Sequence, residues 1–329
     1  MVITFSVGGS VSGPRPIDPN RDFPQLASLL QTVFHDELNS RGQRAAFDSA
    51  VFASTPPLLW RLDPFFARLT PGFVWEEDGR IVGNVTLLPT SLPRRWIIAN
   101  VAVFPAYRRH GIARALMEAA QREAQKRGAY EIRLQVDSDN NSAKDLYSSL
   151  GYSTLGTLKT WNLVSSRSRF PDNDLYAIDE QADVIEMPRS RWRDAYKLDL
   201  ATGQADLCWP DPLPGDAYRR NLRRRLADFL GGKHFEIWMA GGESAELRGF
   251  ATINGEWGKI HQLRVRVHPD SRGELEQVLI LKLLRRLHYL PRRTVRMFHD
   301  ADDPVMNELL PSLRFRDSRT LTQMRLALK

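Results

Sequence analysis

The sequence predicts an α/β protein made of two tandem copies of one fold, each a mixed, mostly antiparallel sheet flanked by helices. Strand-like apolar runs alternate with segments whose apolar residues recur at helical spacing. Landmarks of the first half also recur in the second half at a nearly constant offset. A length of 329 residues suits two domains better than one.

Two pairs of segments show the repeat. Residues 101–105, Val-Ala-Val-Phe-Pro, match residues 265–269, Val-Arg-Val-His-Pro, at an offset of 164 positions. Residues 146–152, Leu-Tyr-Ser-Ser-Leu-Gly-Tyr, match the segment that ends at Phe315 at an offset of 163. Because two landmarks agree within one residue, we interpret the halves as copies.

A linker separates the copies in this interpretation. Residues 166–174 are polar, poor in apolar side chains and interrupted by a proline, which is typical of a connecting segment. We therefore expect a first domain over 14–165, a linker over 166–174 and a second domain over 175–329.

The sequence of the first half predicts a series of helices and strands. Its helices are expected over 23–34, 44–52, 112–127 and 141–150, and its strands over 73–77, 80–88, 96–103, 129–136 and within 153–164. The dipeptide Asp78-Gly79 is typical of a tight hairpin turn between the first two strands. Pro105 ends the central strand, and the apolar residues from Ile112 onward recur at helical spacing.

The connection between the central strand and the next helix is basic and contains a glycine. Arg108, Arg109 and His110 precede Gly111, and a helix begins at once. The first N–H groups of a helix have no internal partner, and the helix dipole favours negative charge there. Because glycine lets the backbone approach a ligand closely, this turn is suited to binding an anion.

This connection resembles motif A of the GNAT superfamily, the acyl-CoA-dependent N-acyltransferases, V-x-P-x-x-(Q/R)-x-x-G-x-(G/A). Its fixed positions are filled by Val103, Pro105, Arg108, Gly111 and Ala113. Residues 140–152 resemble motif B of the same superfamily, N-x-x-A-x-x-L-Y-x-x-x-G-(F/Y). The two motifs occur in the family's order, and the resemblance covers roughly residues 14–165.

The resemblance implies that acetyl-CoA is the co-substrate and that no metal is needed. In the family, a bulge in the central strand frees backbone groups for the pantetheine arm, and the loop holds the diphosphate. The expected cofactor-binding residues are Val101, Val103, Arg108, Arg109, His110, Gly111, Ile112, Ala113, Arg114, Asn140 and Ala143.

The resemblance also assigns chemistry. An amine attacks the thioester directly, and Tyr147, at the family's general-acid position, protonates the departing thiolate. The general base stays open, because residues 97–100 lack a carboxylate. Asn100 can hydrogen-bond the amine or a water molecule, Glu76 or Glu77 can act through water, or the amine can lose its proton to solvent before it binds.

The second copy has lost these features. Leu275 stands at the position of Gly111, Leu310 at that of Tyr147, and the loop carries Glu274 and Glu276. Carboxylates repel a diphosphate, so we expect the second copy to keep its core without a cofactor site.

Composition excludes several classes of function. The net charge of +7 is spread over both halves, because residues 1–165 carry 18 basic and 15 acidic side chains and the remainder carries 28 and 24. The arginines between Tyr218 and Phe229 are interpreted as the solvated face of a helix whose apolar stripe is buried, so nucleic acid is not an expected partner.

No apolar run reaches the ~18 residues of a membrane span. The single Cys208 permits no internal disulfide, which suits a cytoplasmic protein.

The leading hypothesis is an N-acetyltransferase that acts on an amine of a small molecule or peptide. The alternative is a non-catalytic module that binds acyl-CoA as a regulator. Variable loops, here 34–57 and 86–95, supply acceptor pockets in the family. We expect a monomer or weak dimer, with the second domain in the place of a dimer mate.

Overall fold

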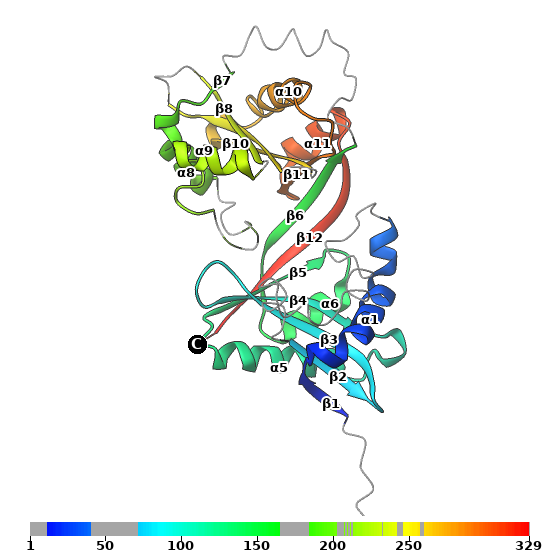
Figure 1. Ribbon diagram of the computed structural model, residues 1–329. Coiled ribbons are helices and arrows are strands. Elements are labelled where there is room, and N and C mark those ends of the chain that lie inside the picture. The colour runs from blue at the N-terminus through cyan, green and yellow to red at the C-terminus, as the bar shows by residue number, and fades with distance from the viewer. Residues whose placement is uncertain are drawn as a thin grey trace, which may run out of the picture. The chain divides into compact units, whose positions relative to one another are not determined.

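The computed structural model describes residues 12–40, 72–164, 184–202, 207, 209, 211, 213–231, 233–241, 246–256 and 260–328. Contacts divide the chain into two compact units. The first comprises Met1–Thr154 with Met324–Lys329, and the second comprises Leu155–Gln323. Figure 1 labels the elements of both units.

Two long strands belong to both units. Strand β6 (Ser153–Leu163) begins in the first unit and ends in the second, whereas β12 (Arg316–Ala327) begins in the second and ends in the first. The sequence placed the last strands of the first domain within 153–164, but the end of the chain also contributes one. Ser153 Oγ donates to the Arg325 carbonyl (3.4 Å) across a separation of 172 residues, a pairing that no local pattern encodes. The expected linker over 166–174 lies outside the described residues.

The sheet of the first unit has the order β1-β2-β3-β4-β5, followed by the end of β12. Its strands are β1 (Gly13–Pro16), β2 (Gly72–Glu77), β3 (Arg80–Pro89), β4 (Arg95–Val103) and β5 (Glu131–Asp137). The pairs from β1 to β4 are antiparallel, and β4–β5 is parallel. The predicted hairpin is confirmed, because Asp78 and Gly79 both have positive φ (50° and 77°), as a tight two-residue turn requires.

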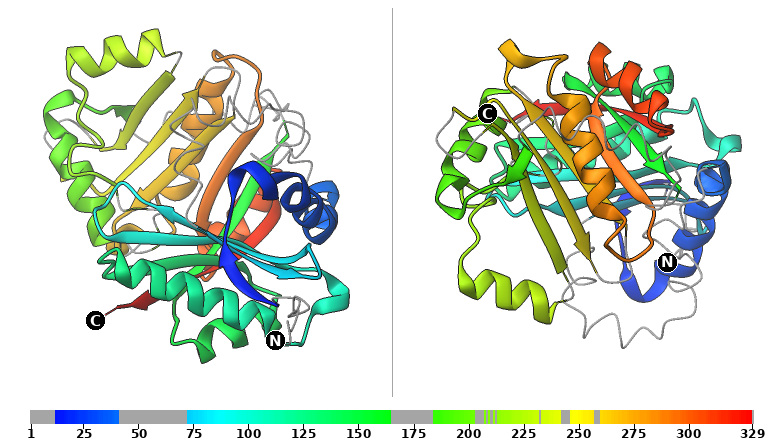
Figure 2. Two further views of the ribbon diagram at one scale, coloured as in Figure 1. Left: turned by 60° about the horizontal axis from the view of Figure 1, so that its bottom comes forward. Right: turned by 90° about the horizontal axis from the view of Figure 1, so that it is seen from above.

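Helices cover both faces of this sheet. Ile81 and Ala102 point to one face and pack in a cluster with Leu29 of α1 (Pro19–Ser40). Val103 points to the other face and packs in a cluster with α5 (Ile112–Lys126) and α6 (Asn141–Ser149). Figure 2 shows α1 on one side of the strands and α5 and α6 on the other. The helix expected over 44–52 lies outside the described residues.

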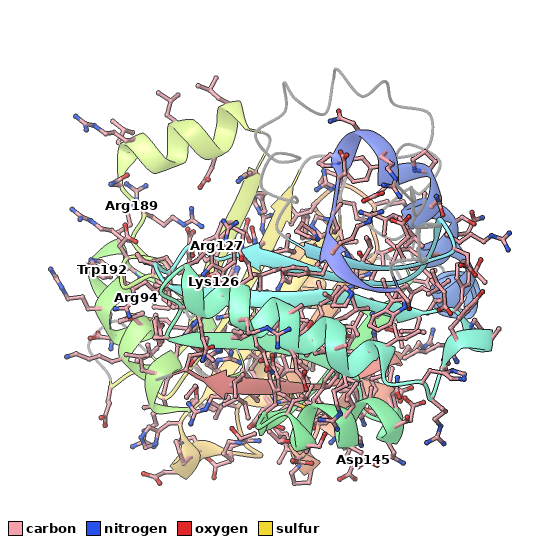
Figure 3. The ribbon with its side chains drawn as sticks, turned by 90° about the horizontal axis from the view of Figure 1, so that it is seen from below. Arg94, Lys126, Arg127, Asp145, Arg189 and Trp192 are labelled. Atoms are coloured by element: carbon pink, nitrogen blue, oxygen red, sulfur yellow. The ribbon has the colours of Figure 1, made fainter. Side chains whose placement is uncertain are left out.

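Basic side chains mark the C-terminal end of α5, where they complement the helix dipole. Figure 3 shows Arg94, Lys126 and Arg127 gathered there, while Asp145 lies on the separate helix α6. Arg94 Nε donates to the Gly128 carbonyl (2.7 Å), and the Arg127 guanidinium lies 5.6 Å from the centroid of the Trp96 ring. These contacts fix the far end of α5 and leave its N-terminus for the candidate site.

The second unit has the sheet order β12-β6-β11-β10-β9-β8-β7. Its further elements are β7 (Val184–Glu186), α8 (Trp192–Ala201), α9 (Leu222–Leu230), β8 (Lys233–Ala240), β9 (Gly249–Glu256), β10 (His261–Val267), α10 (Glu276–Leu287), β11 (Val295–Asp300) and α11 (Pro304–Ser312). As in the first unit, a parallel pair, β10–β11, follows antiparallel pairs. The predicted repeat of one α/β fold is confirmed.

Backbone dihedral angles support the equivalence of the copies. Phe104 (φ −52°, ψ 139°) and His268 (φ −57°, ψ 142°) begin matching short 3₁₀ turns. Positive φ also recurs at the expected offset, at Arg109 (68°) and Gly273 (87°). The copies therefore share the backbone path from the strand as far as Arg109 and Gly273, and they differ at the N-cap, where Gly111 has a φ of 79° and Leu275 a φ of −103°.

One helix differs from its prediction. Helix α9 begins at Leu222, so Tyr218 precedes it and is buried, where its hydroxyl donates to Asp199 Oδ2 (3.0 Å). Leu222 and Leu226 are 79% and 58% exposed and do not form a buried stripe. The buried Asp199 carboxylate needs donors, which explains why Tyr218 lies inward instead of extending the helix. Among the described helices, none is long and apolar enough to cross a bilayer.

Candidate active site

Strand β4 carries a bulge. Asn84 of β3 pairs with Ala102, but Thr86 pairs with Ala99, so β4 has one residue more than β3 in this interval. Asn100 lies in the bulge with a φ of 53°, a left-handed conformation that asparagine tolerates better than most residues. The bulge expected beside Val101 and Val103 is present.

Strands β4 and β5 separate soon after they meet. Their ladder pairs only the three residues from Arg95 to Ile97 with Glu131 to Arg133. A buried ion cluster holds this short stretch, because the Glu131 Oε1 atom lies 2.8 Å from Arg95 Nε and 2.7 Å from Arg133 Nε. Beyond Ile97, β4 no longer pairs with β5, so the backbone groups on this edge of β4 are available to a ligand that carries its own amide groups.

The loop after β4 turns through the short 3₁₀ helix Pro105–Tyr107 and presents Arg108, Arg109 and His110 to solvent. Arg109 has positive φ, which places it in a strained conformation for a non-glycine residue. Gly111 is the N-cap of α5, with a φ of 79°. The loop therefore directs its basic side chains and its backbone amides to the start of the helix.

The N-terminus of α5 fits an anionic diphosphate. No side chain caps the helix, so the amides of Ile112, Ala113 and Arg114 keep their donors available. A Cβ atom built on Gly111 would meet nothing within 4 Å, which shows open space beside the backbone. Arg114 donates to Ser149 Oγ of α6 (2.7 Å), which ties the two helices together at this end. This turn can bind a phosphate through amides and guanidinium groups.

One predicted cofactor contact already has an internal partner. Arg108 Nε donates to the Val103 carbonyl (3.2 Å), so that carbonyl is not free, while the same guanidinium remains close to the loop. Val103 still lies in the part of β4 that does not pair with β5.

Asn140 and Ala143 form the N-terminus of α6. Asn140 is the N-cap, and its Oδ1 accepts the Ala143 N–H (3.1 Å). This contact stabilises the first turn of α6. Both residues lie next to the end of β5, where motif B was expected to meet the cofactor.

Tyr147 lies on the buried side of α6. It is 6% exposed, and its ring centroid lies 6.1 Å from that of Tyr152. Burial disfavours the phenolate and raises the pKa of Tyr147 to about 12. The hydroxyl therefore keeps its proton at neutral pH, as a proton donor must.

Two residues beside Asn100 were missed in the sequence. Asn84 Nδ2 donates to the Asn100 carbonyl (2.8 Å) and, at 3.4 Å, to Thr86 Oγ1. Asn100 Nδ2 also donates to Thr86 Oγ1 (3.3 Å). The signal in the sequence was an asparagine inside the otherwise apolar strand run from Ile81 to Leu88.

Glu76 does not join this site. Its carboxylate accepts hydrogen bonds from Arg15 Nε (2.5 Å) and from Arg21 Nη2 (2.5 and 2.6 Å). These hydrogen bonds, Arg15 first, hold the pKa of Glu76 below its ordinary value. A carboxylate that is stabilised in its charged form is a weak base, so the structure argues against Glu76 as the base for the amine. Its arginine partners tie β1 and α1 to β2.

The equivalent loop of the second unit is filled by its own side chain. Glu276, 3% exposed, accepts the Gly273 N–H at Oε2 (2.8 Å), and its Oε1 lies 3.1 Å from Arg272 Nε. Arg272 also pairs with Asp303, which in turn contacts His299. An internal carboxylate thus takes the Gly273 N–H and the Arg272 guanidinium, two groups that an anion in this loop would use, whereas the first amides of α10 have no side-chain cap.

The described residues contain no group of three or more His, Cys, Asp or Glu side chains that could hold a metal ion.

Comparisons with known proteins agree with this geometry. Residues 35–152 match the acetyltransferase (GNAT) family. The N-alpha-acetyltransferase of Sulfurisphaera tokodaii is 33% identical over 99 residues, which cover 26% of this chain and 59% of that protein. The ribosomal protein bS18-alanine N-acetyltransferase of Escherichia coli is 45% identical over 53 residues, which cover 16% and 36%. The chain thus spans less than two thirds of these curated relatives.

Solved structures share the fold across nearly the whole chain. A GCN5-related N-acetyltransferase from Sphaerobacter thermophilus has a TM-score of 0.61 at 14% identity, covering 96% of this chain and 95% of that one. A tandem GNAT protein from the clavulanic acid biosynthesis pathway has a TM-score of 0.53 at 17% identity, covering 96% and 98%. At these identities the likeness shows the fold alone.

Proposed function

Residues 35–152 match the acetyltransferase (GNAT) family, and on that premise we propose that the first unit of the chain transfers the acetyl group of acetyl-CoA to an amine. The observation that carries the proposal is the uncapped N-terminus of α5, with Gly111 in a left-handed conformation, directly after a bulged strand that leaves its parallel neighbour. One side of this arrangement suits a diphosphate and the other suits an extended amide-containing arm.

In the proposed reaction, the loop and helix amides from Arg109 to Arg114 bind the diphosphate, assisted by the Arg108 and Arg109 guanidinium groups. Binding there orients the thioester beside the β4 bulge, which supplies proximity to a second substrate. Asn140 and Ala143 support this site by fixing the first turn of α6. Val101 lies within the bulge, where it would lie alongside the pantetheine arm.

The amine nitrogen attacks the thioester carbon, the C–S bond breaks, and its electron pair moves to sulfur. Tyr147 is proposed to donate its hydroxyl proton to that sulfur. The pKa of about 12 makes Tyr147 a weak acid, but the same burial also raises the proton affinity of the departing thiolate. The nitrogen releases a proton to solvent, and solvent returns one to Tyr147.

No carboxylate of the first unit is assigned as a base. Residues 97–100 carry none, and Glu76 is held by Arg15 and Arg21. We therefore propose that the amine binds after losing its proton to water.

The test is thioester consumption with a panel of primary amines, followed by mass spectrometry of the amine. Two relatives are named for α-amino and alanine acetylation, so the panel includes peptides with a free N-terminal alanine. We expect CoA release to require an amine and to yield the N-acetyl product. CoA binding without any acetylated product would overturn the proposal.

The second candidate is a module that binds acyl-CoA and acetylates nothing. The specific observation in its favour is the lack of a carboxylate over residues 97–100. It predicts tight acetyl-CoA binding and a thioester that persists in the presence of every amine tested.

A further inference from the structure

We propose that Asn84, Thr86 and Asn100 form the subsite that receives the attacking amine, with Asn84 Oδ1 and Asn100 Oδ1 as acceptors for its N–H groups. This inference rests on the proposed function, because it places the second substrate of that reaction. We call these three residues the amide cluster.

The amide cluster is buried and has a fixed orientation. Asn84 is 1% exposed, and Thr86 is also buried. The Asn84 amide must direct Nδ2 toward the Asn100 carbonyl at 2.8 Å, because the opposite orientation would place two oxygen atoms against each other. This hydrogen bond also supports the bulge in β4.

The hydrogen bonds of the cluster leave acceptors unused. Asn84 Oδ1 is buried and has no partner, which is costly for a polar atom. Thr86 Oγ1 already receives both side-chain amides, at 3.4 and 3.3 Å. Asn84 Nδ2 is also engaged, so what remains is acceptor capacity on the two amide oxygens. A primary amine supplies the matching N–H donors.

The position of the cluster agrees with this role. Gly83 and Val85 face α5, so Asn84 and Thr86, which alternate with them, point to the opposite face of the sheet, the face on which α1 packs. The cluster therefore lies beside the bulge, on the sheet face opposite the phosphate-binding helix. Figure 2 shows α1 and α5 on these two faces. An amine at the cluster would approach the central strand from the side that the diphosphate does not occupy.

The second unit shows that the fold does not need this cluster. Strand β9 pairs with β10 without a shift from His261 to Val267, so the bulge is missing there. Thr252 keeps the position of Thr86, but Phe250 replaces Asn84 and is fully buried against Tyr218. An apolar side chain satisfies the fold at this position, and the unpaired oxygen of Asn84 calls for another explanation, which substrate binding provides.

The neutral amides also select the reactive form of the substrate. Unlike a carboxylate, they do not hold an ammonium ion in a buried site, so they favour the uncharged amine whose lone pair attacks. In the balanced step, the N–C bond forms as the C–S bond breaks, the nitrogen gives one proton to water, and sulfur gains the proton of Tyr147. No other reactant is needed.

The test compares Asn100→Gly and Thr86→Val with Thr252→Val, the same substitution at the equivalent position of the second unit. Glycine accepts the positive φ of Asn100, so Asn100→Gly removes the side chain and keeps the bulge. The probes are the best primary amine of the panel and its N,N-dimethyl analogue, which lacks N–H donors when neutral. Affinity is measured by calorimetry on the CoA-saturated protein and as the acceptor KM.

We expect Asn100→Gly to weaken the primary amine about 10-fold, the effect of one hydrogen bond, with CoA affinity and the binding of the dimethyl analogue unchanged. Thr86→Val should act in the same direction, and Thr252→Val should change nothing. Equal amine affinity in wild type and both cluster variants would overturn the inference, as would failure of the wild type to bind any amine. Amine binding without turnover would instead overturn the proposed function and leave the cluster variants as the test of the subsite.

Discussion

The loops that lead to Gly111 and to Glu276 begin with the same backbone turns but differ in their N-caps and in their charge. Both leave a strand through a short 3₁₀ turn and pass a residue with positive φ before a helix begins. Neither helix has a side-chain cap, but in the first loop the N-cap is a left-handed glycine and the loop carries no carboxylate. In the second, the Glu276 carboxylate accepts the Gly273 N–H and pairs with Arg272.

The difference shows what a duplicated site keeps and what it loses. The second copy retains a buried apolar helix face, with Leu279, Leu283 and Leu287 fully inside, because the fold depends on that packing. Its loop carries its own anion, because the buried Glu276 carboxylate accepts the Gly273 N–H and pairs with the exposed Arg272. These contacts stabilise the loop without a ligand.

The largest expected effect separates the two loops directly. Gly111→Glu adds a side chain and a negative charge where the diphosphate is proposed to bind, so CoA affinity should fall by ~100-fold or more. Gly273→Glu adds the same side chain at a positive-φ position of the second loop and should leave CoA affinity unchanged. Calorimetry measures both. An unaltered affinity in folded Gly111→Glu would remove the first loop from cofactor binding.

The next effect concerns the chemistry. Tyr147→Phe should lower kcat by ~10²-fold with little change in CoA affinity, which is the magnitude of losing a general acid. Tyr152→Phe is the control, because Tyr152 is a second tyrosine buried beside Tyr147. Steady-state kinetics with the best amine of the panel gives the comparison. If both variants turn over at the wild-type rate, Tyr147 has no part in proton transfer.

A smaller effect is expected on stability. Glu276→Gln removes the buried charge that pairs with Arg272, and we expect the free energy of unfolding to fall by about 1–3 kcal/mol. Glu274→Gln alters an exposed carboxylate of the same loop and should cost less than about 0.5 kcal/mol. Urea unfolding of both variants provides the measurement. Equal stability would mean that Glu276 does not hold the second loop.

The smallest expected effect is that of pH on the protonation of Tyr147. Burial disfavours the Tyr147 phenolate and raises its pKa to about 12, so the acid stays protonated as the pH rises. Because no carboxylate base is assigned, kcat/KM should rise with pH as the fraction of neutral amine rises. We expect no decrease in kcat/KM at any pH up to about 11. A descending limb near pH 10 that disappears in Tyr147→Phe would show that Tyr147 titrates in its ordinary range.

Local patterns predicted the part of the site that is local. The run from Val103 to Ala113 encodes a strand end, a basic turn and a helix start, and the structure has all three. The Asp78-Gly79 hairpin was equally readable, because turn chemistry depends on neighbouring residues.

Long-range partners decided what the sequence left out. Glu76, a candidate base from the sequence, accepts hydrogen bonds from Arg15 and Arg21, at separations of 61 and 55 residues. The pairing of β12 with the first unit joins residues that are distant in the chain. The inward turn of Glu276 was also beyond the pattern, since charge alone predicted repulsion and not an internal hydrogen bond.

Hydrogen–deuterium exchange with and without CoA tests the central claim most directly, because it reports on the amides of both loops in one experiment. We expect CoA to slow exchange over residues 109–115, where open space lies beside Gly111, and to leave residues 273–279 unchanged, where Glu276 accepts the Gly273 N–H and presents a carboxylate to any anion. Protection of residues 273–279 by CoA, or none at 109–115, would contradict the assignment of one functional and one internally filled loop.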